Sequence, residues 1–158
     1  MRRFGAALVA SRFVPLVLLA LFAACGAPGP EPIALGVDGC DYCRMTISDA
    51  RFGGEAVTTK GRVHKFDSVE CLAGWARTAP PGSVRALFVT DAQHPGTFVP
   101  ADSAGFIKDG FMKSPMGKSL VGFASVKRAE EQRTMLGGTV LTWAEVLAGA
   151  ATPLRGDR

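Results

Sequence analysis

The residues best suited to chemistry in this 158-residue chain lie in one short run, residues 40–45, which reads Cys-Asp-Tyr-Cys-Arg-Met. Thiolate and thioether sulfurs are soft ligands, which select Cu(I) over harder ions. In an extended segment Cys43 and Met45 would lie on one side of the chain, because side chains alternate. A thiolate paired with a neutral thioether can hold copper outside the cell and still release it. The spacing therefore favours a Cu(I) site on these two residues.

A low-coordinate copper site needs a third soft ligand. Met112 and Met116 lie in residues 111–117, a polar and turn-prone stretch where a core methionine is less expected. Packing is still the ordinary role of a methionine in a small domain, so the spacing alone leaves both roles open. His64 and His94 are interpreted as surface or structural residues.

The number of cysteines is itself informative. The chain has four cysteines. Cys25 follows an apolar leader, and the other three are Cys40, Cys43 and Cys71. If Cys25 carries a lipid, three thiols remain, and an odd number cannot all pair. A free thiol is a liability in an oxidising compartment unless the protein uses it. The count points to a ligand or a catalytic thiol.

Two other interpretations of the Cys-x-x-Cys pair stay open. One is a thiol–disulfide oxidoreductase using Cys40 and Cys43, which needs the first cysteine at the start of a helix, where its pKa falls. The residues after the pair show no helical period. The other is a structural zinc module for protein contacts, in which Cys71 and His64 complete the pair, although the chain has no second tight cysteine pair.

Residues 1–24 have the layout of an export signal, with three arginines, an apolar run over 14–22 and two alanines before Cys25. The apolar run is too short for a membrane-spanning helix. Its small-small-Cys ending resembles a bacterial lipobox, which predicts cleavage after residue 24 and lipidation of Cys25. Residues 25–36, rich in Gly and Pro, then form a flexible tether. We expect an exported, membrane-anchored lipoprotein that faces the periplasm, at the outer membrane.

The net charge of +4 changes once this signal is set aside. Removing residues 1–24 takes away three arginines and no acids, which leaves 15 basic and 14 acidic residues. No Lys/Arg-rich run or aromatic–basic pattern remains, so nucleic acid is excluded as a partner. With 47% hydrophobic and 20% charged residues, the chain is not of the disordered class.

The body of the chain contains two similar stretches. Phe-Asp-Ser-Val at 66–69 recurs as Phe-Ala-Ser-Val at 123–126, and Gly-Ser-Val at 82–84 recurs as Gly-Thr-Val at 138–140. Each serine can cap the helix that follows it. The sequence therefore predicts an α+β fold of two tandem ββαβ units, 37–93 and 94–154. Units this small bury little surface alone, so we expect them to pack together.

Hydrophobic periodicity and strand-forming runs give the expected bounds. The predicted helices span 69–77, 126–136 and 143–148, and the predicted strands span 54–59, 62–66, 84–90, 105–108, 119–124 and 140–142. In the first helix Val69, Leu72, Trp75 and Ala76 are expected to be buried. In the second helix Val126, Ala129 and Leu136 are expected to face inward.

Taken together, these residues resemble the NosL family, the copper-binding lipoproteins of nitrous oxide reductase maturation. The similar parts are the Cys-x-x-Cys-x-Met run after a lipobox, Phe-Asp-Ser leading into a helix with Gly74-Trp75, Ser-Pro-Met-Gly at 114–117 and Gly-Phe-Ala at 122–124. The resemblance covers nearly all of the mature chain. It implies two related ββαβ units with a treble-clef-like organisation.

The resemblance also implies a function and a ligand set. Family members are not enzymes: they bind Cu(I) and supply it to periplasmic nitrous oxide reductase, so that enzyme and its maturation machinery are the implied partners. Cys43 and Met45 match the family's Cys-x-Met ligands, and Met116 matches its downstream methionine. Cys40 matches the first cysteine of the motif and is a candidate additional ligand. The family usually has Gly at the position of Arg44. Cys71 matches no family ligand.

Overall fold

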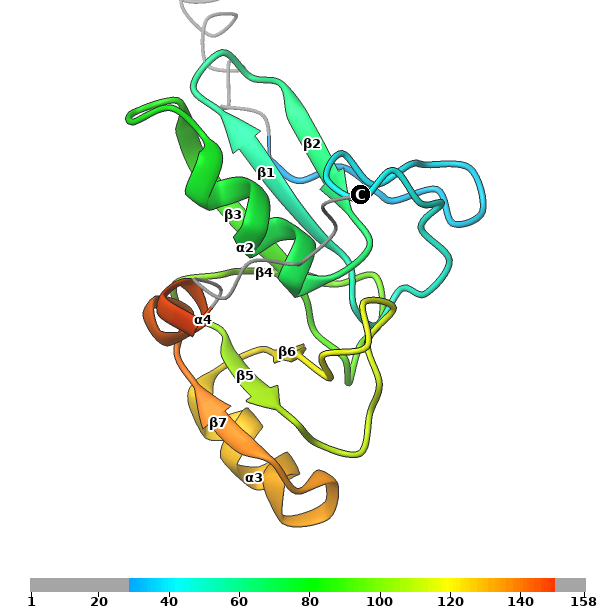
Figure 1. Ribbon diagram of the computed structural model, residues 1–158, viewed down its shortest axis with the longest axis vertical. Coiled ribbons are helices and arrows are strands. Elements are labelled where there is room, and N and C mark those ends of the chain that lie inside the picture. The colour runs from blue at the N-terminus through cyan, green and yellow to red at the C-terminus, as the bar shows by residue number, and fades with distance from the viewer. Residues whose placement is uncertain (1–28, 150–158) are drawn as a thin grey trace, which may run out of the picture.

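The computed structural model describes residues 29–149, which form two antiparallel sheets that lie one above the other in Figure 1. The first sheet has the order β2-β1-β3-β4, built from β1 (Gly54–Thr58), β2 (Val63–Phe66), β3 (Val84–Thr90) and β4 (Phe98–Pro100). The second has the order β6-β5-β7, built from β5 (Gly105–Lys108), β6 (Val121–Phe123) and β7 (Thr139–Leu141). The helices are α2 (Val69–Thr78), α3 (Val126–Leu136) and α4 (Trp143–Gly149).

The two sheets repeat one topology. The first strand of each unit is central, since β1 pairs with β2 and β3, and β5 pairs with β6 and β7. Helix α2 packs against β1 and α3 packs against β5 (Figure 1). The predicted α+β fold of two ββαβ units is confirmed. The predicted bounds of β3 and β5 match, and those of β1, β2, β6 and β7 differ by one or two residues at an end.

Both central helices begin at the predicted serine caps. Ser68 and Ser125 have extended backbones, with φ of −155° and −163°. The Ser68 hydroxyl accepts a hydrogen bond from the Cys71 amide at 3.2 Å, and Ser125 accepts one from the Arg128 amide at 3.3 Å. Each bond satisfies an amide that the first turn of a helix leaves without a carbonyl partner. The capping also decides where Cys71 lies, within the first turn of α2.

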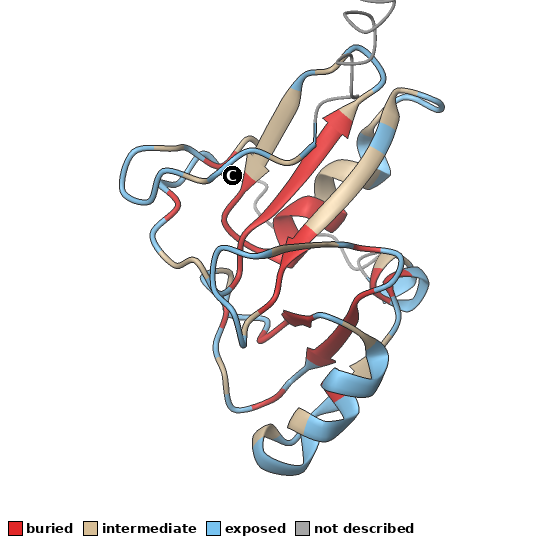
Figure 2. Ribbon diagram, turned by 180° about the vertical axis from the view of Figure 1, so that it is seen from behind, coloured by how far each residue is buried: buried red, intermediate tan, exposed pale blue. Residues whose placement is uncertain are grey.

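The units share one hydrophobic core. Its buried cluster joins Phe66 and Leu72 of the first unit to Phe106 and Trp143 of the second. Most of strand β1 is buried, as Figure 2 shows, because α2 covers it from one side. A smaller cluster fills the second unit: Phe52, Ile107, Val121, Phe123 and Ala129. The expectation that the units pack together is correct.

Several details differ from the sequence-based expectation, and one is that Trp75 and Ala76 are only half-buried. Strand β4 was not expected. It lies after residue 94, within the predicted second unit, yet it joins the sheet of the first unit by pairing Val99 with Val89. It is only three residues long and ends at a proline, so its strand signal is weak. Val126 is 39% exposed and does not face inward. Its backbone makes the contact instead, since a Cβ on Gly105 would lie 2.5 Å from the Val126 Cα.

Several predictions concern residues that the structure does not describe. They are the signal at 1–24, the lipidation of Cys25, the start of the tether up to residue 28, and the end of the second unit beyond residue 149. Between residues 29 and 149, none of the helices has the length and apolar character needed to cross a membrane.

Candidate metal centre

Residues 40–45 form a tight turn. The Cys40 amide donates to the Met45 carbonyl at 2.8 Å, and the Arg44 amide donates to the Cys40 carbonyl at 3.0 Å. Arg44 has a φ of 67°, in the left-handed region that non-glycine residues seldom adopt. The chain therefore reverses between Cys43 and Met45. The expectation of an extended segment was wrong at this point.

Strand β2 holds the turn in place. The Asp41 amide donates to the Lys65 carbonyl at 2.8 Å, and the Asp41 carboxylate lies 2.6 Å from Nδ1 of His64. The His64 ring in turn stacks at a tilt on Trp75 of α2, with 4.7 Å between the ring centroids. His64 is thus a structural residue, as interpreted from the sequence, and it couples the cysteine turn to the sheet and to the helix.

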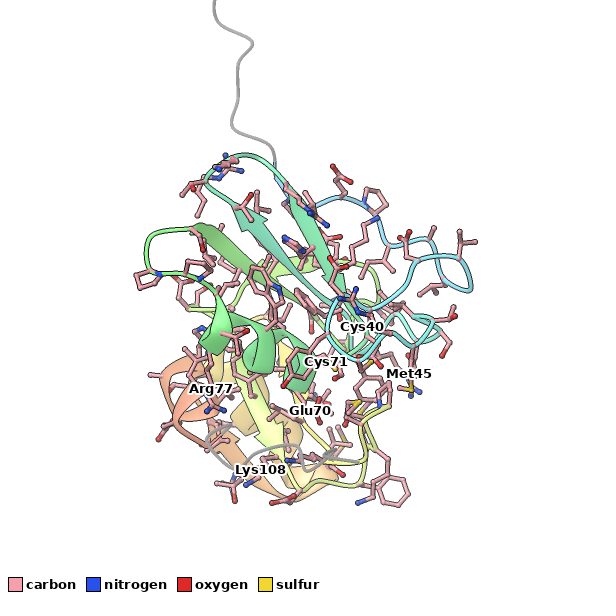
Figure 3. All side chains as sticks on the ribbon, turned by 45° about the horizontal axis from the view of Figure 1, so that its top comes forward. Cys40, Met45, Glu70, Cys71, Arg77 and Lys108 are labelled. Carbon is pink, nitrogen blue, oxygen red and sulfur yellow. The ribbon has the colours of Figure 1, made fainter. Side chains whose placement is uncertain are left out.

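Four side chains meet where this turn approaches the start of α2. The sulfurs of Cys40, Cys43 and Cys71 and a carboxylate oxygen of Asp67 all lie within 4.8 Å of one another. Asp67 stands between the end of β2 and the Ser68 cap. Figure 3 shows Cys40 and Cys71 between the turn and the helix. The three cysteines are free thiols.

Burial divides the thiols into two classes. Cys40 and Cys71 are 1% and 0% exposed, whereas Cys43 is half-buried and its sulfur lies 3.5 Å from Oδ2 of Asp67. The Cys71 thiol donates to the Cys40 sulfur, which stabilises the Cys40 thiolate against the effect of burial and lowers the pKa of Cys40 to about 6. The same bond, together with burial, raises the pKa of Cys71. Burial is also the main reason that the pKa of Cys43 is raised to about 11.

These four side chains fit a cation. The lowered pKa of Cys40 favours a thiolate, which would place negative charge in a buried position, and Oδ1 of the buried Asp67 has no hydrogen-bond partner. A buried charge and an unpartnered carboxylate oxygen are costly unless a positive charge compensates them. A soft metal ion would satisfy both at once, because thiolates are its preferred ligands.

The methionines lie at different depths. Met45 is 46% exposed. Met116 is partly buried and packs against the core cluster that contains Cys40 and Cys71. Met112 packs instead against the smaller cluster of the second unit. Of the two loop methionines, Met116 therefore lies on the core cluster that the cysteines share. That Met45 and Met116 bind metal stays a prediction.

Glu70 ties the Met116 loop to the cysteines. This buried residue of α2 precedes Cys71, and its Oε1 accepts hydrogen bonds from the Ser114 hydroxyl and from the Leu120 amide, the latter at 3.2 Å. Both partners flank Met116 in the chain. Sequence reasoning gave Glu70 no role, because a glutamate in the first turn of a helix ordinarily serves the helix dipole.

Two members of the cluster were not predicted as copper ligands. Cys71 had no assigned ligand role, except in the zinc interpretation, and Asp67 was noted only as part of the repeat before the helix cap. The zinc interpretation proposed His64 as the fourth ligand, but His64 bonds to Asp41 instead. The fourth side chain of the cluster is Asp67. Cys40 does not begin a helix, which removes the geometry that the oxidoreductase interpretation required.

Comparison with known proteins agrees with this architecture. The NosL family model matches residues 34–150. The crystal structure of the copper chaperone NosL from Shewanella denitrificans matches with a TM-score of 0.62 and 22% identity, covering 74% of this chain and 94% of that chain. No curated protein gave a match. Since the family model spans well over half of its length, the chain belongs to the NosL family.

Proposed function

We propose that this chain is a copper chaperone that holds Cu(I) as cargo at the turn of residues 40–45. The observation that carries the proposal is the convergence of three thiols and a carboxylate within 4.8 Å. Membership of the NosL family supports it, as does the fold shared with a copper chaperone. The role is binding and transfer, without catalysis.

Cys43 is the central ligand in this proposal, with Met45 and Met116 as thioether ligands and Cys40 as an additional one. Cys43 is the half-buried thiol of the cluster, and Met45 beside it is 46% exposed. A ligand at the surface can be displaced by a ligand of a partner protein while the deeper sulfurs still hold the ion. Copper can thus pass by stepwise ligand exchange and is never released as a free ion.

The receiving partner is proposed to be nitrous oxide reductase, together with its maturation machinery. The support is the match of residues 34–150 to the family and the Cys-x-x-Cys-x-Met motif. The chaperone is proposed to act in the periplasm, tethered to a membrane by a lipid on Cys25. The support for the tether is the signal-like composition of residues 1–24.

An anaerobic Cu(I) titration against a colorimetric chelator tests the site. Cys43→Ala should abolish tight binding, and Met45→Ala and Met116→Ala should each weaken it about tenfold or more, in the range seen when residues that support a metal site are lost. Met135→Ala is the matched control, because Met135 is an exposed methionine of α3. Wild-type affinity in the Cys43→Ala protein would show that copper binds elsewhere.

A structural zinc site is the second candidate, and one observation favours it. Three sulfurs and one carboxylate oxygen make a four-ligand set of the kind that zinc binds tetrahedrally. A structural zinc would be needed for folding, so its removal should unfold the protein. Elemental analysis of the purified protein, followed by circular dichroism after chelation, separates the two: a copper carrier keeps its fold without metal.

A further inference from the structure

The cluster contains one thiol more than the proposed copper site needs. Cys71 lies on α2, belongs to no part of the Cys-x-Met motif and is completely buried. It donates a hydrogen bond to the sulfur of Cys40, which is buried as well. Two adjacent buried thiols that touch each other are the starting geometry for a disulfide.

The contacts favour this pair over the other two. Cys43 also contacts the Cys40 sulfur, but its thiol donates to Asp67 as well, with its sulfur 3.5 Å from Oδ2 of that residue. The hydrogen bond from Cys71 is the strongest that the Cys40 sulfur receives. A bond between Cys40 and Cys43 would close across the tight turn, whose two hydrogen bonds join Cys40 to Met45 and to Arg44. A bond between Cys40 and Cys71 would instead link the turn to α2, which already lie in contact.

We propose that Cys40 and Cys71 form a disulfide when the metal-free protein meets an oxidising disulfide, and that this bond turns a three-thiol site into a one-thiol site. Cys43 then remains the single free thiol of the cluster. The inference gives Cys71 a role in regulating the site, and it rests on the proposed function for its biological meaning. The bond itself forms whether or not copper is the cargo.

Cys43 is the entry point for the oxidant, because it is the only one of the three thiols that is not fully buried. Its thiolate attacks a disulfide R–S–S–R, which gives a mixed disulfide and releases one thiolate RS⁻. Cys40 then attacks the Cys43 sulfur and releases the second RS⁻. Cys71 attacks the Cys40 sulfur and frees Cys43 again. In sum, Cys40 and Cys71 are oxidised, R–S–S–R is reduced to two RSH, and the two thiol protons end on those products.

The consequence is a change in the metals that the site accepts. The reduced protein presents three thiols and Asp67, a set suited to a tetrahedral divalent ion such as Zn(II). The oxidised protein presents Cys43 with its neighbouring thioethers, a set suited to Cu(I). Oxidation in an exported protein would thus exclude zinc from the copper site.

Disulfide mapping tests the bond in the full chain carrying Cys25→Ser, so that three thiols remain. The metal-free protein is treated with oxidised glutathione, its free thiols are alkylated, and it is cleaved after Tyr42, which separates Cys40 from Cys43. We expect the thiol count to fall from three to one, with Cys40 linked to Cys71 and Cys43 alkylated. The proposal would be overturned if the final product contained a disulfide to Cys43, or if all three thiols remained free.

Two variants and two metals complete the test. Cys43→Ser should form the same bond more slowly, while Cys71→Ser cannot form it. The oxidised wild-type protein should lose Zn(II) binding and keep Cu(I) binding, and unchanged Zn(II) affinity would contradict the proposed switch. The copper proposal fails separately, if Cu(I) affinity is insensitive to Cys43→Ala. Because the Cys25→Ser chain used for mapping leaves the cluster unaltered, misfolding of the cluster variants cannot obscure the result.

Discussion

At the scale of single residues, the cysteine turn contains a conformation that its sequence does not favour. Arg44 has a φ of 67°, where an L-residue with a Cβ is strained. Glycine adopts such a φ without steric cost. The Arg44 side chain contributes little stability, because its ion pair with Asp41 is 3.7 Å long and the side chain is 79% exposed.

Arg44→Gly should therefore stabilise the metal-free protein by roughly 0.5–1 kcal/mol, the net of relieved strain and the greater entropy of glycine in the unfolded chain. The measurement is the midpoint of urea unfolding. Arg62→Gly, in the exposed turn between β1 and β2, is the control and should give no gain, because Arg62 is not among the residues with a positive φ. A lower midpoint for Arg44→Gly would contradict this account of the turn.

Glu55 should make the stability of the protein depend on pH. It is fully buried in β1, its Oε2 accepts a hydrogen bond from the Glu31 amide at 2.8 Å, and its Oε1 has no partner. Burial raises the pKa of Glu55 from 4.5 to about 7. A carboxyl whose pKa is higher in the folded state binds its proton more tightly there. Its contribution is complete below pH 4.5 and is lost as the pH rises through 7.

Glu55→Gln should remove this dependence, since an amide stays neutral. We expect the variant to gain stability relative to wild type between pH 4.5 and 7, and the shift in pKa limits the gain to about 3 kcal/mol. Urea unfolding of both proteins at pH 5 and pH 8 measures the difference. Glu31→Gln, at an exposed carboxylate, should show no such change. If the difference in unfolding free energy between wild type and Glu55→Gln were the same at both pH values, the pH dependence would not come from Glu55.

At the scale of elements, each unit depends on a close approach between its central strand and its helix. The first residue of β1 is Gly54, and the first residue of β5 is Gly105. A Cβ on Gly54 would lie 3.1 Å from the Leu72 side chain of α2, and one on Gly105 would lie 2.5 Å from the Val126 backbone of α3. The same small residue at equivalent positions lets both helices pack directly on their strands.

Gly105→Ala should destabilise the protein by roughly 1–3 kcal/mol, because the backbone of α3 has to move away from β5. Gly74→Ala is the informative comparison. Its added methyl would lie 2.7 Å from the ring of Tyr42, a flexible side chain that can turn aside, and alanine is the better helix former. Thermal unfolding should show a larger loss of stability for Gly105→Ala than for Gly74→Ala. Equal losses of stability would mean that the contact between β5 and α3 does not control stability.

At the scale of the whole molecule, the shared core makes the two units one cooperative structure. Phe66 and Leu72 belong to the same buried cluster as Phe106 and Trp143. Loosening one unit therefore exposes apolar surface of the other. Since the cysteine cluster belongs to the first unit and the Met116 loop to the second, a metal site that includes Met116, as proposed, would depend on the packing of both.

The two tryptophans allow a test of this cooperativity, since Trp75 lies in the first unit and Trp143 in the second. In Trp75→Phe and in Trp143→Phe, the remaining tryptophan reports on one unit. We expect each variant to lose roughly 1–3 kcal/mol, and its fluorescence midpoint to coincide with that of far-UV circular dichroism. Separate midpoints for the two probes would show that the units unfold independently.

Local features of the chain were the ones that could be predicted from the sequence. Ser68 and Ser125 cap α2 and α3 as expected, because capping needs only a hydroxyl three residues before an amide. Strand β3 was predicted with its bounds, since seven consecutive strand-forming residues leave little ambiguity. The motif at 40–45 and the repeated Phe-x-Ser pointed to the NosL family and to its paired units.

The tertiary structure alone decided which residues meet at the candidate metal centre. Cys40 and Cys71 lie on different elements, and their contact depends on how the turn docks on β2 beside the start of α2. Asp67 joins them because the chain passes from β2 into α2 at that point. The left-handed Arg44 makes a turn of a segment that the sequence suggested would be extended, and Met45 after it is 46% exposed. Sequence spacing determines contacts within an element, whereas contacts between elements follow from the packing of the shared core.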